Sequence, residues 1–141
     1  MTIPQWALLG FAVWTLLVLF GTVGVYRWSR ILTGRVRISE WQADQPQGSD
    51  WYRRAMRAHM NCVENLPVFA AIVLCATASG ENSRFLDLLA GAILVARVCQ
   101  TTVHLACTPS EVAASVRFVF FFVQALGMLA MAAAVAVSAI G

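Results

Sequence analysis

Lysine is absent from this chain of 141 residues, and charged residues of any kind make up only 12% of it. A soluble domain carries about 25% charged residues, so this chain has too few to cover a solvated surface. The shortage argues against a soluble globular domain, a disordered tail and a nucleic-acid-binding protein. Hydrophobic residues make up 60% of the sequence, and the mean hydropathy is +0.71. The composition therefore indicates a single domain whose solvent is mostly lipid.

The four cysteines form no recognisable metal-binding or disulfide pattern. None of them stands in a CxxC or CxxxH arrangement, and all lie in or at the ends of apolar segments, where a free cysteine behaves as a small hydrophobic residue. We therefore expect neither a disulfide framework nor a metal site. The N-terminus also lacks a basic segment and a small-residue cleavage site, so we expect the first apolar stretch to be retained.

Four apolar segments, each long enough to cross a hydrocarbon core of about 30 Å, predict four transmembrane helices in one domain over residues 1–141. They cover about residues 3–28, 55–79, 84–107 and 112–140. A polar stretch over residues 29–54 is predicted to be a loop, and short turns separate the later helices. Ser110 or Thr108 is placed to cap the fourth helix, with Glu111 in its first turn. The predicted fold is an all-α, four-helix bundle that is integral to the membrane.

The distribution of arginine predicts how this multi-pass protein is oriented. Seven of the ten arginines lie in or beside the loop over residues 29–54. The positive-inside rule places this loop in the cytoplasm, together with the turn at residues 108–111, and places both termini outside. The absence of lysine and of a targeting signal favours a bacterial inner membrane.

Ionisable residues inside membrane helices are costly and therefore indicate functional sites. In the second predicted helix, Arg57, Asn61 and Glu64 follow the spacing i, i+4, i+7, which places them on one helical face. Arg97 and His104 share a face of the third helix in the same way. Counted at ~1.5 Å per residue, polar positions on three helices reach roughly 10–16 Å into the cytoplasmic half. The polar residues in this half are Arg57, His59, Asn61, Glu64, Arg97, His104 and Arg117.

This set of side chains suits a small ligand that carries both carboxylates and an amine. Glutathione has two carboxylates, one α-ammonium group and a thiol. Arginines would bind the carboxylates, Glu64 would bind the ammonium group, and one guanidinium beside the sulfur would lower the thiol pKa from about 8.5 toward neutrality. Two simpler interpretations stay open, namely an ion pair of Glu64 with Arg97 between helices and a headgroup or carbonyl contact for His59.

Other polar and aromatic residues near the helix ends have simpler explanations. Arg27, Arg30, Arg53 and Arg54 are typical of interfacial anchors, and the five tryptophans are typical of membrane-interface aromatics. Gln124, in the fourth predicted helix, is expected to form a hydrogen bond between helices.

The segment from Arg57 to Pro67, RAHMNCVENLP, resembles the second-helix motif of the MAPEG family, the membrane-associated proteins in eicosanoid and glutathione metabolism. The segment from Thr33 to Arg37, TGRVR, resembles a T-G-x-V-R element found after the first helix in members of that family. Arg97 and the arginine of the fourth helix also match family positions. The resemblance extends over essentially the whole chain.

The resemblance implies a homotrimer of four-helix subunits that bind glutathione between neighbours, near the cytoplasmic side. One subunit would contribute Arg37, and the next would contribute the other wall of the site. The implied glutathione-binding residues are Arg37, Arg57, His59, Asn61, Glu64, Arg97 and His104. Arg117 is the implied catalytic residue, which would stabilise the thiolate.

The function predicted on this basis is that of a membrane-bound glutathione transferase in detoxification. Glutathione would be a consumed cosubstrate, and its partner would be a lipophilic electrophile that enters from membrane lipid. Peroxidase activity stays open as a second activity. His104 stands where relatives have tyrosine and Gln100 where they often have histidine, so the electrophile is not specified. The alternatives are a non-catalytic, lipid-binding scaffold member of the same family and a small four-span transporter.

Overall fold

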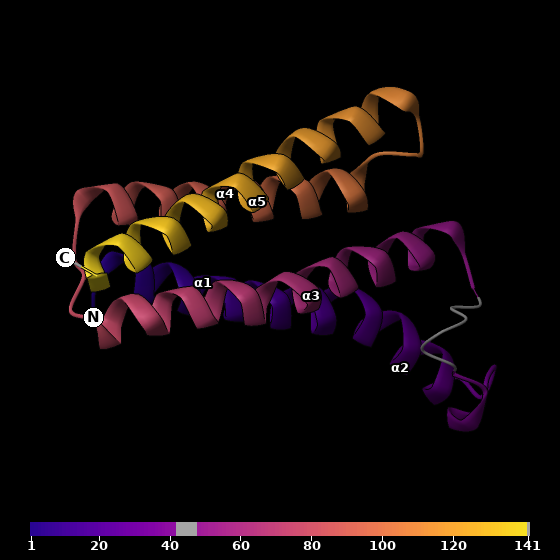
Figure 1. Ribbon diagram of the computed structural model, residues 1–141. Helices are drawn as coiled ribbons and strands as arrows, with labels where there is room; N and C mark the ends of the chain where they lie inside the picture. Colours follow the sequence, from indigo (N-terminus) through magenta and orange to yellow (C-terminus); the bar gives the residue numbers. More distant parts are fainter. Residues whose placement is uncertain (42–47, 141) are drawn as a thin grey trace.

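The computed structural model describes residues 1–41 and 48–140 and consists of long helices that run alongside one another (Figure 1). The first spanning helix, Ile3–Leu32, comprises α1 (Ile3–Val18), the π-helical segment η1 (Leu19–Gly24) and α2 (Val25–Leu32). The others are α3 (Asp50–Ala78), α4 (Arg84–Ala106) and α5 (Glu111–Ile140), and a single 3-10 turn, η2 (Ile38–Glu40), follows α2. All four are long and apolar enough to cross a membrane. The predicted all-α, four-helix membrane bundle is therefore confirmed.

The connection between the first two spanning helices is shorter than the predicted loop over residues 29–54. The first helix continues to Leu32 through η1, and α3 already begins at Asp50. The earlier start has a local cause, because the Ser49 hydroxyl accepts a hydrogen bond from the Tyr52 amide at 3.3 Å and caps the helix. At α5, the Ser110 hydroxyl accepts from the Ala113 amide at 3.1 Å, as predicted for a cap.

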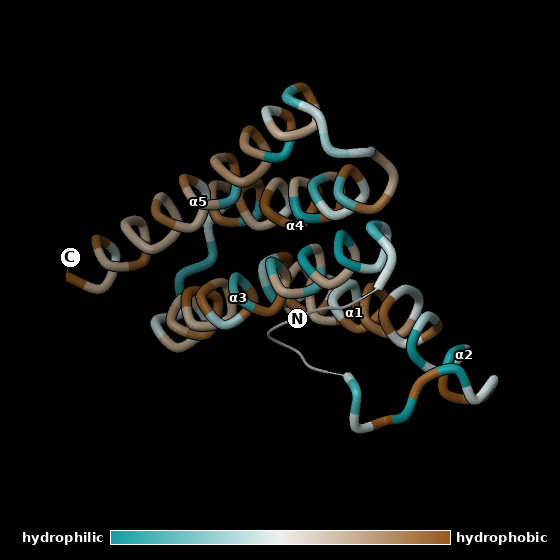
Figure 2. Tube along the Cα trace, turned by 90° about the vertical axis from the view of Figure 1, so that its right-hand side faces the viewer, coloured by the Kyte–Doolittle hydropathy of each residue, from teal (hydrophilic) through white to brown (hydrophobic). Residues whose placement is uncertain are grey.

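The helices pack so that both termini and the α3–α4 turn lie at one end of the bundle (Figure 1). The α4–α5 turn, α2 and the start of α3 lie at the other end. Figure 2 shows hydrophilic residues on α3 and α4 toward this second end, whereas α5 is largely hydrophobic toward its C-terminus. The polar half predicted from the sequence is therefore present at the end that carries the arginine-rich connection.

Close approach of α4 to its two neighbours depends on glycine. A Cβ atom at Gly127 of α5 would lie 3.0 Å from Cγ1 of Ile93, and a Cβ atom at Gly10 of α1 would lie 3.0 Å from Cδ2 of Leu94. Because lipid is as apolar as a protein core, helices in membranes associate through such tight packing rather than through the hydrophobic effect. Gly10 and Gly127 therefore let α1, α4 and α5 share one buried core.

A second packed cluster closes the end of the bundle that carries α2. The rings of Tyr26 and Tyr52 stack with centroids 4.4 Å apart, and Trp41 meets Tyr52 edge-on at 5.5 Å. Arg27 donates from Nε to the Tyr52 hydroxyl at 2.6 Å, and its guanidinium lies 5.2 Å from the Trp41 ring centre. Trp41 and Arg27, which were predicted to be interfacial, therefore also pack against Tyr52 of α3.

Candidate functional site

One polar cluster joins three helices at the arginine-rich end of the bundle. It consists of Asn61 on α3, His104 on α4 and Arg117 on α5. Nδ2 of Asn61 lies 3.3 Å from Nε2 of His104, and Nη1 of Arg117 lies 3.4 Å from Nδ1 of the same ring. His104 is buried, whereas Asn61 and Arg117 are half-buried. A single imidazole therefore links α3 to α5.

The hydrogen bonds define the protonation of the His104 ring. A guanidinium can only donate, so Nδ1 of His104 must accept from Arg117 and carries no proton. The neutral ring then carries its proton on Nε2. A half-turn of the Asn61 amide exchanges its oxygen and nitrogen, which lets Oδ1 accept from that N–H. Both ring nitrogens of His104 are then hydrogen-bonded, with an uncharged imidazole beside a charged arginine.

An open pocket of about 340 Å³ adjoins the cluster between α4 and α5. The wall combines the polar ends of His104 and Arg117 with apolar rings. Its lining residues are Gln100, His104, Ala114, Arg117, Phe118 and Phe121. A charged guanidinium in a largely apolar recess is suited to stabilise an anion beside a hydrophobic group.

Arg57 and Glu64 lie on α3 on either side of Asn61, and both are exposed in the single subunit. Within the part of the chain that the structure describes, the only ion pair joins Arg53 to Asp50. The ion pair of Glu64 with Arg97 that was considered from the sequence is therefore not formed. The two α3 charges keep the shared face predicted for them, but neither lines the pocket beside Arg117.

Arg97 is buried within the bundle and does not line the pocket. It is 1% exposed, and its guanidinium carbon lies 5.2 Å from the centre of the Phe11 ring on α1. Its Nε and Nη2 atoms have no hydrogen-bond partner among the described residues. In the described part of the chain, no hydrogen bond joins Arg97 to His104 or Arg117, although the sequence grouped all three.

The two remaining predicted residues also lie outside the cluster. Arg37 is exposed after α2, where its backbone N–H donates to the Glu40 carboxylate at 3.4 Å. His59 is half-buried on α3, and its Nδ1 is buried without a partner among the described residues. Of the predicted site residues, the structure thus brings only Asn61, His104 and Arg117 into contact within one subunit.

The protein-family model of the MAPEG family matches residues 4–137, which is nearly the whole chain. The chain belongs to the MAPEG family. Comparison with curated proteins and with solved structures gave no significant match. The family includes glutathione transferases as well as some non-catalytic members. Membership and the four apolar helices together make this MAPEG protein an integral membrane protein.

Two glutamines that the sequence analysis did not assign to the site support the cluster of this MAPEG protein. Nε2 of Gln100 donates to the backbone carbonyl of Arg117 at 3.2 Å, and Nε2 of Gln124 donates to Oε1 of Gln100 at 3.0 Å. The hydrogen bond between helices predicted for Gln124 is therefore confirmed. In the sequence, Gln100 stands four residues before His104. This spacing places both residues on one face of a helix, which was the available signal that Gln100 lies beside the pocket.

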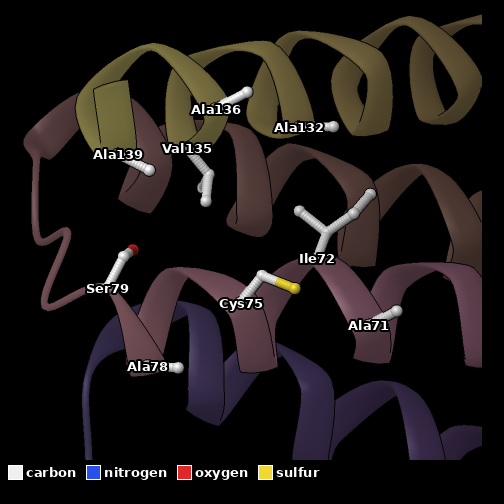
Figure 3. A pocket seen from close by; sticks show the side chains of 9 residues that line it. All are labelled: Ala71, Ile72, Cys75, Ala78, Ser79, Ala132, Val135, Ala136 and Ala139. Atoms are coloured by element: carbon white, nitrogen blue, oxygen red, sulfur yellow. The ribbon is translucent and has the colours of Figure 1, made fainter. Parts of the chain in front are cut away.

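A larger groove of about 620 Å³ opens between α3 and α5 near the opposite end of the bundle (Figure 3). Its wall is apolar apart from one hydroxyl and one thiol. The lining residues are Ala71, Ile72, Cys75, Ala78, Ser79, Ala132, Val135, Ala136 and Ala139. The groove carries no arginine or carboxylate to bind glutathione, so the smaller pocket beside Arg117 is the better candidate for chemistry.

Proposed function

We propose that this MAPEG protein is a membrane-bound glutathione transferase that adds the glutathione thiolate to a lipophilic electrophile. The observation that carries the proposal is the Arg117 guanidinium, bonded to His104 and lining a mostly apolar pocket of about 340 Å³. Membership of a family that includes glutathione transferases supports glutathione as the cosubstrate.

In this proposal, Arg117 stabilises the thiolate. Its guanidinium stays charged at any working pH, and the attraction to a sulfur anion is stronger in an apolar recess than in water. The thiol loses its proton to solvent, the sulfur forms a bond to the electrophilic carbon, and the leaving group departs with its electron pair. Phe118 and Phe121 provide the apolar wall against which the electrophile would lie.

The charges on α3 would bind the ends of glutathione. Arg57 and Glu64 are exposed in the single subunit, inside a helix that spans the membrane. Charged residues at such positions normally face another protein surface or a ligand rather than lipid. We infer that Arg57 binds a carboxylate, that Glu64 binds the ammonium group, and that Arg37 of a neighbouring subunit completes the site in a homotrimer.

The test starts with purified protein in lipid nanodiscs. Calorimetry measures whether glutathione binds, and absorbance then follows conjugation of chlorodinitrobenzene and reduction of an organic hydroperoxide. The proposal expects both binding and conjugation, and the hydroperoxide assay decides whether peroxidase activity is present. Binding without turnover would indicate a non-catalytic member. An absence of binding would contradict the proposal and leave the scaffold or the transporter.

A further inference from the structure

Two buried glutamines connect the middle of α4 to α5 beside Arg117. Nε2 of Gln124 donates to Oε1 of Gln100 at 3.0 Å, and Nε2 of Gln100 donates to the Arg117 carbonyl at 3.2 Å. Gln124 is 0% exposed and Gln100 is 5% exposed. A chain of hydrogen bonds therefore runs from the Gln124 amide through the Gln100 amide to the backbone of Arg117, which lines the pocket.

Each amide in this chain is oriented by its neighbours. Nε2 of Gln124 donates twice, to Gln100 and to the Phe120 carbonyl at 2.8 Å. Because Oε1 of Gln100 accepts from Gln124, its Nε2 must point the other way, toward Arg117. The Arg117 carbonyl has two lone pairs, so it can accept this bond in addition to a helical one. Without Gln124, Oε1 of Gln100 would lose its donor, and only the bond to the Arg117 carbonyl would orient the amide.

Gln100 binds the backbone carbonyl of Arg117, and this position argues for a role beyond holding α4 and α5 together. α4 and α5 already meet closely where Gly127 faces Ile93. The glutamines act at a different point, on the main chain of the residue whose side chain contacts His104 at 3.4 Å. A displacement of about 1 Å in a catalytic group can lower a rate by up to about 10²-fold, so this main-chain contact bears directly on the chemistry.

We propose that Gln100 and Gln124 are positioning residues, which hold the Arg117 backbone so that its guanidinium faces the pocket and the glutathione sulfur. This inference rests on the function proposed above. Gln124 is fully buried and does not line the pocket, whereas Gln100 lies in the pocket wall, so Gln124 is the clearer test of positioning. The effect of Gln124 should therefore be seen in the reactivity of bound glutathione rather than in its affinity.

The test compares Gln100→Leu and Gln124→Leu with the wild-type protein in nanodiscs. Leucine is similar in size and removes the amide. We expect the glutathione Kd to stay within about twofold and kcat to fall roughly tenfold. The pKa of the bound thiol, followed by thiolate absorbance, should rise toward that of free glutathione. Gln100→His keeps an N–H donor and should recover most of the lost kcat.

Gln5→Leu is the matched control, because it removes another amide hydrogen bond between helices, from Gln5 to Thr77 at 3.1 Å. We expect it to leave kcat and the thiol pKa unchanged. If Gln124→Leu lowers only the thermal stability and keeps the wild-type kcat and thiol pKa, the glutamines merely join the helices and the inference is wrong.

A measurement without glutathione separates this inference from the proposed function. The NMR shifts of the His104 ring nitrogens report its contact with Arg117 in the empty protein. If the wild type binds no glutathione, the proposed function fails. The NMR shifts alone then test whether the glutamines position Arg117. Shifts that move in both leucine variants but not in Gln5→Leu support positioning, whereas unchanged shifts overturn it.

Discussion

The side chain of His104 shows how much the chemistry of one residue depends on its two neighbours. Arg117 requires an acceptor at Nδ1, so the ring stays neutral, and Asn61 then has to accept from Nε2. A protonated ring would present a second donor and a like charge to the guanidinium. The orientation of Arg117 therefore depends on a neutral His104.

The exposed charges of Arg57 and Glu64 on α3 give a prediction about the affinity for glutathione. Arg57→Ala removes a contact to a carboxylate, and Glu64→Gln weakens a contact to the ammonium group. We expect each change to weaken glutathione binding by about 1.5–3 kcal/mol, the range for a hydrogen bond to a charged group. Calorimetry measures the change, with Arg35→Ala as the control, since Arg35 is an exposed arginine outside the proposed site. Equal losses in all three variants would indicate a general charge effect instead.

At the scale of helices, the length of each apolar segment was enough to predict four spans, and serine side chains cap the start of three of them. The sequence could not predict that α3 starts at Asp50, because the capping Ser49 lies within an otherwise polar stretch. It placed Arg97 and His104 on one face of α4, but spacing does not reveal which neighbour that face meets. Arg97 lies against Phe11 of α1, whereas His104 contacts α3 and α5.

The close contact of α4 with α5 gives a prediction about stability. A Cβ atom at Gly127 would lie 3.0 Å from Ile93, which is fully buried, whereas a Cβ atom at Gly91 would meet nothing within 4 Å. We expect Gly127→Val to destabilise the bundle by about 1–3 kcal/mol through overpacking, and Gly91→Val to have a smaller effect. Thermal unfolding in detergent compares the two. A larger loss in the Gly91 variant would contradict the packing described for α5.

The distribution of arginine predicts how the whole molecule is oriented in the membrane, and labelling can test that prediction. A cysteine at Asn82, in the α3–α4 turn, should react with an impermeant thiol reagent added to intact cells. A cysteine at Gln47, which lies outside the described residues, should not react, because the positive-inside rule places its loop in the cytoplasm. The exposed Cys75 and Cys107 are replaced beforehand. The reverse labelling pattern would overturn the orientation.

Assembly of subunits into an oligomer is the second property that concerns the whole molecule. Arg37 lies beyond α2 and contacts no member of the cluster in its own subunit, so we expect it to serve the site of a neighbour. Subunits with Arg37→Ala and subunits with Glu64→Ala should each be inactive alone. When co-expressed, they should recover some activity, because mixed trimers contain sites with both residues intact. No recovery in demonstrably mixed oligomers would place the site within one chain.

The ultraviolet absorbance of the glutathione thiolate, recorded across pH for the wild type and for Arg117→Ala, tests the central claim most directly. Both proteins should bind glutathione. In the wild type, the bound thiol should be ionised at neutral pH, because the guanidinium favours the anion. In Arg117→Ala, the thiol pKa should rise toward about 8.5, and the conjugation rate should be low at neutral pH and recover as pH rises. An unchanged thiolate signal and rate in Arg117→Ala would contradict the account.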